Sequence, residues 1–256
     1  MKQNHTIKIL FILIMVCSLF ISCKKSKKEV DQKRLSQVIV YTYDSFSGEW
    51  GPGPEIARLF FEKTGLNVVY SDCGDGVEIL SKAIIEKSQP YADVLLGLDN
   101  NLIKKVEESE VLSVYEPKNR DVIPENLKKE LGEKWLLTPF DYSPFAIIYN
   151  KNSNLEKPTC LEDLTKEIYN KKIILMDPRT STPGLGFETW VKKVYGSNYE
   201  DYMNRLKPSV LTITPGWSVG YGMFTEGEAP LVISYVTSPA YHIEYKNGYV
   251  TKIVKI

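Results

Sequence analysis

The sequence predicts an α/β protein of two lobes, each built on a mainly parallel sheet that helices cover. Short apolar runs, rich in β-branched and aromatic residues, alternate with amphipathic helical patterns, and this order is typical of parallel sheets. The alternation occurs twice, in residues 38–108 and in residues 145–235. A length of 256 residues is enough for one or two domains with proper hydrophobic cores.

The first half of the chain predicts three strands, each followed by a helix. This order predicts parallel pairing of the strands. Pro54 suits a first helical turn, and Gly65 can end the same helix. We expect strands at 38–43, 66–70 and 93–98, and helices at 55–64, 76–87 and from 102 to 108.

The second half repeats this pattern, with a polar loop at 177–186 before the predicted helix at 187–195. We expect the chain to cross between the lobes near 138–143 and again near 234–240. Lobe 1 would then hold residues 38–139 and 240–256, and lobe 2 residues 140–239 with the crossover strands. The predicted strands are 145–149, 172–176, 210–214 and 231–235, and the predicted helices are 161–165, 187–195, 199–207 and 219–224.

Residues 1–37 are predicted to be an export signal and a tether. Residues 9–22 form an apolar run without charges, shorter than the ~20 residues of a membrane-spanning helix. Ser22-Cys23 at its end resembles a bacterial lipoprotein signal, so residues 1–23 would be the signal and Cys23 the lipidated residue. A secreted chain and a retained helix are the alternatives. Polar residues 24–37 suit a flexible tether to the membrane.

Charge and cysteine usage exclude several functions. Lys plus Arg and Asp plus Glu both number 32, so no basic field favours a nucleic-acid partner. Cys73 and Cys160 lie in different predicted lobes, and we expect two free thiols that pack as small buried apolar groups. No spacing of cysteine and histidine suits a zinc site, so we expect no metal.

The loops that follow the predicted strands are the expected ligand site, because open parallel sheets bind ligands beyond their carboxyl ends. In the first half these loops are 44–54, 71–76 and 99–101. Aromatic residues gather in predicted loops and element ends, and aromatic faces suit a flat cation. A single tyrosine there is more often an ordinary strand residue. The cluster consists of Trp50, Trp217, Tyr221, Tyr235 and Tyr241.

Two further motifs each have a functional and a structural interpretation. Ser181 and Thr182 precede Pro183 at a predicted helix start, which suits a phosphate or carboxylate, or simply a helix cap. Residues 216–220 match the G-x-S-x-G pattern of serine hydrolases, with Ser218 as nucleophile. The short interval to His242 leaves little room for the rest of a triad, so we favour a chain without catalytic residues.

Eight segments in a fixed order resemble the thiamine-binding periplasmic proteins. The resemblance covers residues 38–245, and several of the matching runs exceed seven residues. The segments are 40–46 (VYTYDSF), 50–54 (WGPGP), 75–76 (DG), 92–102 (ADVLLGLDNNL), 139–142 (PFDY), 177–186 (DPRTSTPGLG), 216–218 (GWS) and 234–242 (SYVTSPAYH).

The resemblance implies a type II periplasmic-binding-protein fold with mainly parallel mixed sheets. It implies an extracytoplasmic solute-binding component of an ABC importer, located in the periplasm or at the cell surface and anchored through Cys23. The ligand would be thiamine and its phosphate esters, held between the lobes. The partners would be the ABC permease and its ATPase. No cofactor is implied, because thiamine is the transported ligand.

The resemblance also implies the ligand contacts. Asp75 and Gly76 match the segment of lobe 1 that meets the ligand, while Ser181 and Thr182 match the contacts on the phosphate side. Trp217 matches a contact to a ring. The remaining matches are Tyr235, Val236, Thr237, Ser238 and Pro239 in the crossover strand, Tyr241 packed on the ligand, and Tyr43 and Trp50 along the cleft.

Family members continue beyond the point that matches Lys255, with helices of lobe 1 and another ligand-facing tryptophan. We therefore expect lobe 1 to be incomplete at its C-terminal side, and the isolated 256-residue chain to bind weakly or not at all. Two other ligands suit the same fold, a polyamine and a ferric ion with its anion. Iron commonly needs adjacent tyrosines, and the stretch 234–237 has only Tyr235.

Overall fold

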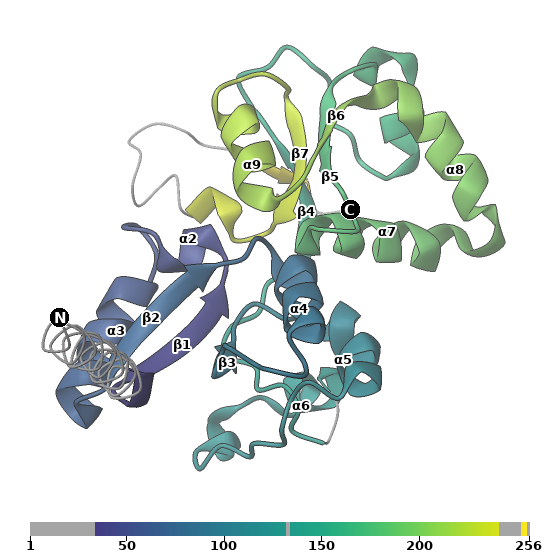
Figure 1. The fold of residues 1–256 in the computed structure, drawn as a ribbon. Coiled ribbons are helices and arrows are strands. Elements are labelled where there is room, and N and C mark those ends of the chain that lie inside the picture. Colours follow the sequence, from purple (N-terminus) through teal and green to yellow (C-terminus); the bar gives the residue numbers. More distant parts are fainter. Residues whose placement is uncertain (1–33, 132–133, 241–251, 255–256) are drawn as a thin grey trace, which may run out of the picture.

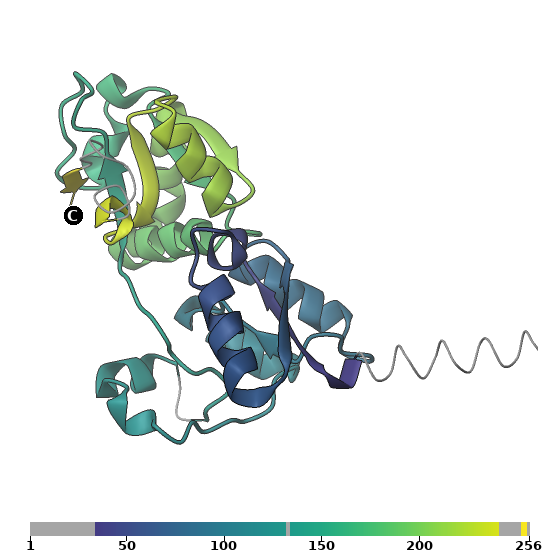
Figure 2. The ribbon, with the colours of Figure 1, turned by 90° about the vertical axis from the view of Figure 1, so that its left-hand side faces the viewer.

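The computed structural model describes residues 34–131, 134–240 and 252–254. These residues form two lobes, one with a three-stranded and one with a five-stranded sheet (Figure 1). Residues 138–144 have no regular secondary structure and lead from the first lobe to the second (Figure 2). The expected return crossing near 234–240 stays a prediction, and the predicted signal at 1–23 lies outside the described residues.

Lobe 1 has the predicted parallel sheet, in the order β2-β1-β3. Its strands are β1 (Gln37–Thr42), β2 (Asn67–Asp72) and β3 (Val94–Leu95). Its helices are α2 (Asp44–Ser47), α3 (Gly53–Thr64), α4 (Gly76–Ile85), α5 (Ile103–Ser109) and α6 (Glu125–Glu130), with single 3-10 turns η1 (Asn100–Leu102) and η2 (Arg120–Val122).

The third strand is much shorter than the predicted 93–98. The Asp93 side chain accepts the backbone N–H of Ile39 at 2.8 Å, which replaces part of the β1–β3 ladder. Gly97 then takes a left-handed φ of +113° and ends the strand. A side chain at Gly97 would also place its Cβ 2.7 Å from the Tyr43 ring. The apolar pattern identified the strand but not its early end.

Lobe 2 has a mixed sheet in the order β6-β5-β7-β4-β8, with β4 antiparallel to β7 and β8. Its strands are β4 (Phe145–Tyr149), β5 (Ile173–Met176), β6 (Val210–Thr214), β7 (Leu231–Tyr235) and β8 (Lys252–Val254). Its helices are α7 (Thr182–Tyr195), α8 (Tyr199–Leu206) and α9 (Trp217–Thr225), with 3-10 turns η3 (Glu162–Thr165), η4 (Glu167–Tyr169), η5 (Gly196–Asn198) and η6 (Lys207–Ser209).

The largest differences from the prediction in lobe 2 concern β8 and α7. Strand β8 lies in the range 240–256 that was assigned to lobe 1, yet it pairs with β4, so this assignment is wrong for 252–254. The pairing covers the backbone of β4, which would otherwise be an edge strand. Helix α7 begins at Thr182, five residues before the prediction, because Pro183 and Gly184 fit a first helical turn.

The two lobes differ in how completely they bury apolar side chains. In lobe 2, the apolar residues of β4, β5 and β7 form one core with α7, α8 and α9. In lobe 1, helix α3 leaves Ile56, Leu59 and Phe61 between 45% and 49% exposed. The core of lobe 1 is divided into two smaller clusters. Lobe 2 is therefore the better-packed frame for the loops between the lobes.

The two cysteines of the described residues are free thiols, as predicted, although Cys73 is half-buried and Cys160 is exposed. The expectation that both are buried was therefore wrong. Among the described residues, no helix has the length and apolar character that crossing a membrane requires.

Gly184 gives a test of the contact between α7 and β5. A Cβ at this position would lie 2.5 Å from the carbonyl oxygen of Met176, which is backbone and cannot swing away. We expect Gly184→Ala to lower the free energy of unfolding by ~1–3 kcal/mol, measured by urea denaturation. Gly222→Ala is the control, because a Cβ there meets no atom within 4 Å. Equal midpoints for both variants would contradict this packing.

Candidate ligand-binding site

Loops from both lobes meet at the carboxyl ends of the parallel strands, where the sequence analysis expected a site. Lobe 1 contributes the residues after β1 and β2. Lobe 2 contributes the residues after β5, β6 and β7. The pairs that join the two lobes by hydrogen bonds are Asp75 with Ser181 and Trp217, Gly76 with Thr182, and Asp44 with Ser218.

Asp75 is the central residue of this junction. It is the N-cap of α4, but its side chain makes no capping hydrogen bond. Its Oδ2 instead accepts from Ser181 Oγ at 2.7 Å and from the backbone N–H of Trp217 at 3.1 Å. Both donors belong to lobe 2. One carboxylate of lobe 1 therefore accepts hydrogen bonds from residues at the starts of two helices of lobe 2, α7 and α9.

Gly76 brings the two backbones close together beside this carboxylate. Its N–H donates to Thr182 Oγ1 at 3.1 Å. A Cβ at Gly76 would lie 2.3 Å from the carbonyl oxygen of Gly97 and 2.9 Å from Thr182 Oγ1. Only glycine fits here without moving the loops. The structure thus brings together four predicted site residues, Asp75, Gly76, Ser181 and Thr182.

A second contact between the lobes was not predicted. Ser218 Oγ donates to Asp44 Oδ1 at 2.6 Å, joining the start of α9 to α2. The serine of the G-x-S-x-G pattern is thus hydrogen-bonded to a carboxylate. His242, its suggested partner, lies outside the described residues. Asp44 follows β1 within the motif 40–46, and this position was the signal that could have identified it.

Acidic groups dominate the electrostatics between the lobes. Burial raises the pKa of Tyr43 to about 12, and Asp141 and Asp75 add to this effect. Burial also raises the pKa of Tyr235, again reinforced by Asp75, Asp99 and Asp141. For Asp75 itself, burial raises the pKa despite the hydrogen bonds that lower it. Asp99 and Asp141 stand in the segments 99–101 and 139–142 that the sequence analysis singled out, but only the fold brings them near Tyr235.

Trp217 stands beside Asp75 with its ring fixed on two sides. Its ring stacks on Tyr221 at a centroid distance of 4.8 Å and an interplanar angle of 15°. Its Nε1 donates to Ser234 Oγ at 2.7 Å. Tyr235 follows Ser234 and packs against Phe145, with ring centroids 5.1 Å apart. Two of the predicted aromatic contacts therefore lie at the junction of the lobes.

The predicted crossover segment 235–239 is anchored at three points. The N–H of Val236 donates to the carbonyl of Pro144 at 3.0 Å. The hydroxyls of Thr237 and Ser143 lie 3.0 Å apart, and those of Ser238 and Ser234 lie 2.7 Å apart. Buried Pro239 follows. The segment is thus held against both β7 and the connection that enters lobe 2.

Trp50 and Tyr241 are the remaining predicted aromatic contacts. Trp50 lies after α2 with 68% of its surface exposed. Tyr241 lies outside the described residues.

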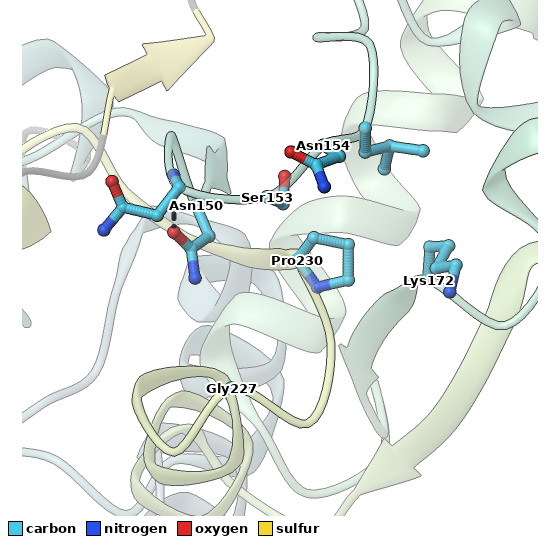
Figure 3. Close-up of a pocket in the computed structure, with 8 residues that line it drawn as sticks. Asn150, Ser153, Asn154, Lys172, Gly227 and Pro230 are labelled. Atoms are coloured by element: carbon cyan, nitrogen blue, oxygen red, sulfur yellow. Dashed lines mark hydrogen bonds between the residues drawn. The ribbon is translucent and has the colours of Figure 1, made fainter.

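The opposite end of lobe 2 carries a separate pocket of about 460 Å³ (Figure 3). It lies where β5 and β7 begin, far along these strands from Asp75. Its lining contains no carboxylate and no aromatic ring, so it lacks the chemistry that the sequence predicts for a cation. The lining residues are Asn150, Asn152, Ser153, Asn154, Leu155, Lys172, Gly227 and Pro230.

Comparisons with known proteins identify the family and the fold. Residues 89–242 match the family model of the bacterial extracellular solute-binding proteins. The thiamine-binding periplasmic protein of Brucella melitensis is 41% identical over 219 residues, which are 83% of this chain and 63% of that protein. The protein of the same name from Escherichia coli is 40% identical over 215 residues, covering 82% of this chain and 64% of its own length.

A solved structure of a periplasmic thiamin binding protein superimposes with a TM-score of 0.76 at 36% identity, covering 86% of this chain and 68% of that one. This likeness confirms the predicted two-lobed periplasmic-binding-protein fold. The family consists of binding proteins and not of enzymes, as the sequence analysis expected. The chain spans somewhat less than two thirds of the curated relatives it matches. It belongs to the bacterial extracellular solute-binding protein family and is a relative of the periplasmic thiamine-binding proteins.

Proposed function

We propose that this protein is the extracytoplasmic binding component of an ABC importer and holds thiamine, or a thiamine phosphate, between its lobes. The observation that carries the proposal is the half-buried carboxylate of Asp75 at the junction of both lobes. The permease and its ATPase are the proposed partners. The lipid anchor at Cys23 and a location in the periplasm or at the cell surface are parts of the same proposal.

The chemistry of thiamine suits the acidic character of this junction. Its thiazolium ring carries a permanent positive charge, and its aminopyrimidine offers hydrogen-bond donors and acceptors. Carboxylates attract the cation, and a half-buried site weakens the competition from water. No lysine or arginine is among the groups that shift the pKa of Asp75, Tyr43 or Tyr235 in the described part of the chain. Stacked rings such as Trp217 add cation–π attraction.

The start of α7 suits the other end of the ligand. Ser181 and Thr182 present two hydroxyls where this fourteen-residue helix begins. Free N–H groups of a first helical turn favour an anion. A phosphate or the hydroxyethyl group of thiamine would compete with Asp75 for the Ser181 hydroxyl. After such an exchange, the ligand would contact both lobes in place of the direct hydrogen bond from Ser181 to Asp75. A closed state that is stabilised by the ligand needs contacts of this kind from both lobes.

The alternatives fit the site less well. A ferric ion favours tyrosine as phenolate, whereas burial and nearby acids raise the pKa of both Tyr43 and Tyr235. A polyamine shares the preference for acids and aromatic rings, and we therefore keep it as the direct competitor in the test. Serine hydrolases usually activate the nucleophile with a histidine. Here the hydroxyl of Ser218 instead donates to the carboxylate of Asp44.

We expect calorimetric titration of the 256-residue chain to give saturable binding of thiamine at one site. The titration should extend to millimolar ligand, so that weak binding is also detected. Spermidine and ferric citrate, titrated under the same conditions, should bind more weakly than thiamine. Tighter binding of either competitor would show that the proposal is wrong.

Replacing the central carboxylate tests the site itself. Asp75→Asn preserves the size of the side chain but removes its charge, so we expect the Kd for thiamine to rise about 10- to 100-fold. Asp121→Asn, which removes a charge from an exposed position of η2, should leave the Kd unchanged. Similar Kd values for wild type and Asp75→Asn would place the ligand elsewhere.

The raised pKa of Asp75 predicts a dependence of binding on pH. A cation favours the ionised carboxylate, so affinity is complete above this pKa and falls below it, by at most about tenfold per pH unit. The decline should begin above the ordinary value of 3.8, because burial raises the pKa of Asp75. The same pH series with Asp75→Asn reports the ligand's own titration. Identical pH profiles for the two proteins would contradict this prediction.

A further inference from the structure

We propose that Ser234 is a positioning residue of the binding site. Its buried hydroxyl, paired with that of Ser238, fixes the orientation of the indole ring of Trp217, whose backbone N–H donates to Asp75. This inference rests on the proposed function, because it assigns to Ser234 an effect on the affinity for thiamine. It adds a residue that the sequence analysis did not place in the site.

A short chain of hydrogen bonds links Trp217 to the crossover segment. Trp217 Nε1 donates to Ser234 Oγ at 2.7 Å, and Ser234 Oγ lies 2.7 Å from Ser238 Oγ. The N–H of Tyr235 donates to Ser238 Oγ at 3.3 Å. Ser234 is 0% exposed and Ser238 is 8% exposed. Water does not compete for these groups, so an indole N–H that lost its partner would remain unsatisfied.

The indole ring is constrained in a way that packing alone would not achieve. Stacking on Tyr221 restrains the tilt of its plane, with an interplanar angle of 15°. Stacked rings can still slide and turn within their plane. The hydrogen bond from Nε1 to Ser234 removes this freedom because it fixes one edge of the ring. The backbone N–H of Trp217 is fixed in turn by Asp75.

The same chain of hydrogen bonds couples two parts of the proposed site. Ser238 belongs to the segment 235–239 that the resemblance assigns to the ligand. Its hydroxyl is engaged with Ser234 and with the N–H of Tyr235. Ser238 therefore acts on the ligand through Trp217 and through the shape of the turn. A ligand that displaces this segment also shifts the support of the indole ring.

Another buried serine of lobe 2 provides a matched control. Ser209 is also 0% exposed, but its hydroxyl has no hydrogen-bond partner in the described part of the chain. It lies where β6 begins, at the end of the sheet away from Asp75. Ser209→Ala therefore removes a buried hydroxyl without touching Trp217.

The experiment combines thiamine titration with near-ultraviolet circular dichroism. The signal of Trp217 is obtained as the difference from Trp217→Phe. We expect Ser234→Ala to change this signal in the ligand-free protein and to raise the Kd for thiamine about tenfold. Ser234→Thr, which keeps the hydroxyl, should restore both, and Ser209→Ala should alter neither. In the Trp217→Phe background, Ser234→Ala should change the Kd less than twofold.

Each contrary result has a definite meaning. An unchanged Trp217 signal in Ser234→Ala overturns the inference, and so does an equal loss of affinity with and without Trp217. Should Ser234→Ala fail to fold, Ser238→Ala tests the second hydroxyl of the pair, with a smaller shift of the Trp217 signal expected and an unchanged signal overturning the inference. Wild-type protein that binds spermidine or ferric citrate more tightly than thiamine refutes the proposed function, while the ligand-free signal still decides the role of Ser234.

Discussion

The carboxylate of Asp75 is the interaction on which the arrangement of the two lobes depends. A half-buried carboxylate is stable only when donors satisfy it. Here the donors are Ser181 Oγ and the N–H of Trp217, at the starts of α7 and α9. Lobe 1 supplies the charge and lobe 2 supplies the donors, so neither lobe satisfies this group alone. Gly76 and Thr182 add a parallel contact one residue further along.

This arrangement is what the proposed function requires of a site that would hold both a cation and an anion. The acids near Tyr43 and Tyr235 create a field that favours positive charge. The helix start at Ser181 and Thr182, on the opposite lobe, favours negative charge. A ligand with a cationic ring and a polar or phosphorylated tail matches both halves. Trp217 contacts both lobes. Its backbone N–H donates to Asp75 of lobe 1, and its indole Nε1 donates to Ser234 of lobe 2.

Much of the fold was predictable, because alternating apolar runs and amphipathic patterns are local signals. Strands β4 and β7 have the predicted bounds, and lobe 1 has the predicted parallel pairing. The short β3 was not predictable, since it depends on a side chain of Asp93 that replaces a ladder hydrogen bond. Nor was β8, whose partner β4 lies about a hundred residues earlier in the chain.

The site shows the same division between local and long-range signals. Asp75, Gly76, Ser181 and Thr182 stand in motifs that could be recognised along the chain, and the fold brings them together. Asp99 and Asp141 also stand in such motifs, but their proximity to Tyr235 follows only from the folded chain. The hydrogen bond from Trp217 to Ser234 could not be predicted from the sequence, because it joins the start of α9 to the end of β7.

A crystal structure of the protein with thiamine bound at neutral pH tests the central claim most directly. The account predicts that the ligand lies between the lobes, with a ring against Trp217 and a charged or amino group beside the Asp75 carboxylate. Its tail should point to Ser181 and Thr182. Ligand density in the asparagine-lined pocket at the far end of lobe 2, with Asp75 still bonded to Ser181 and Trp217, would contradict the account.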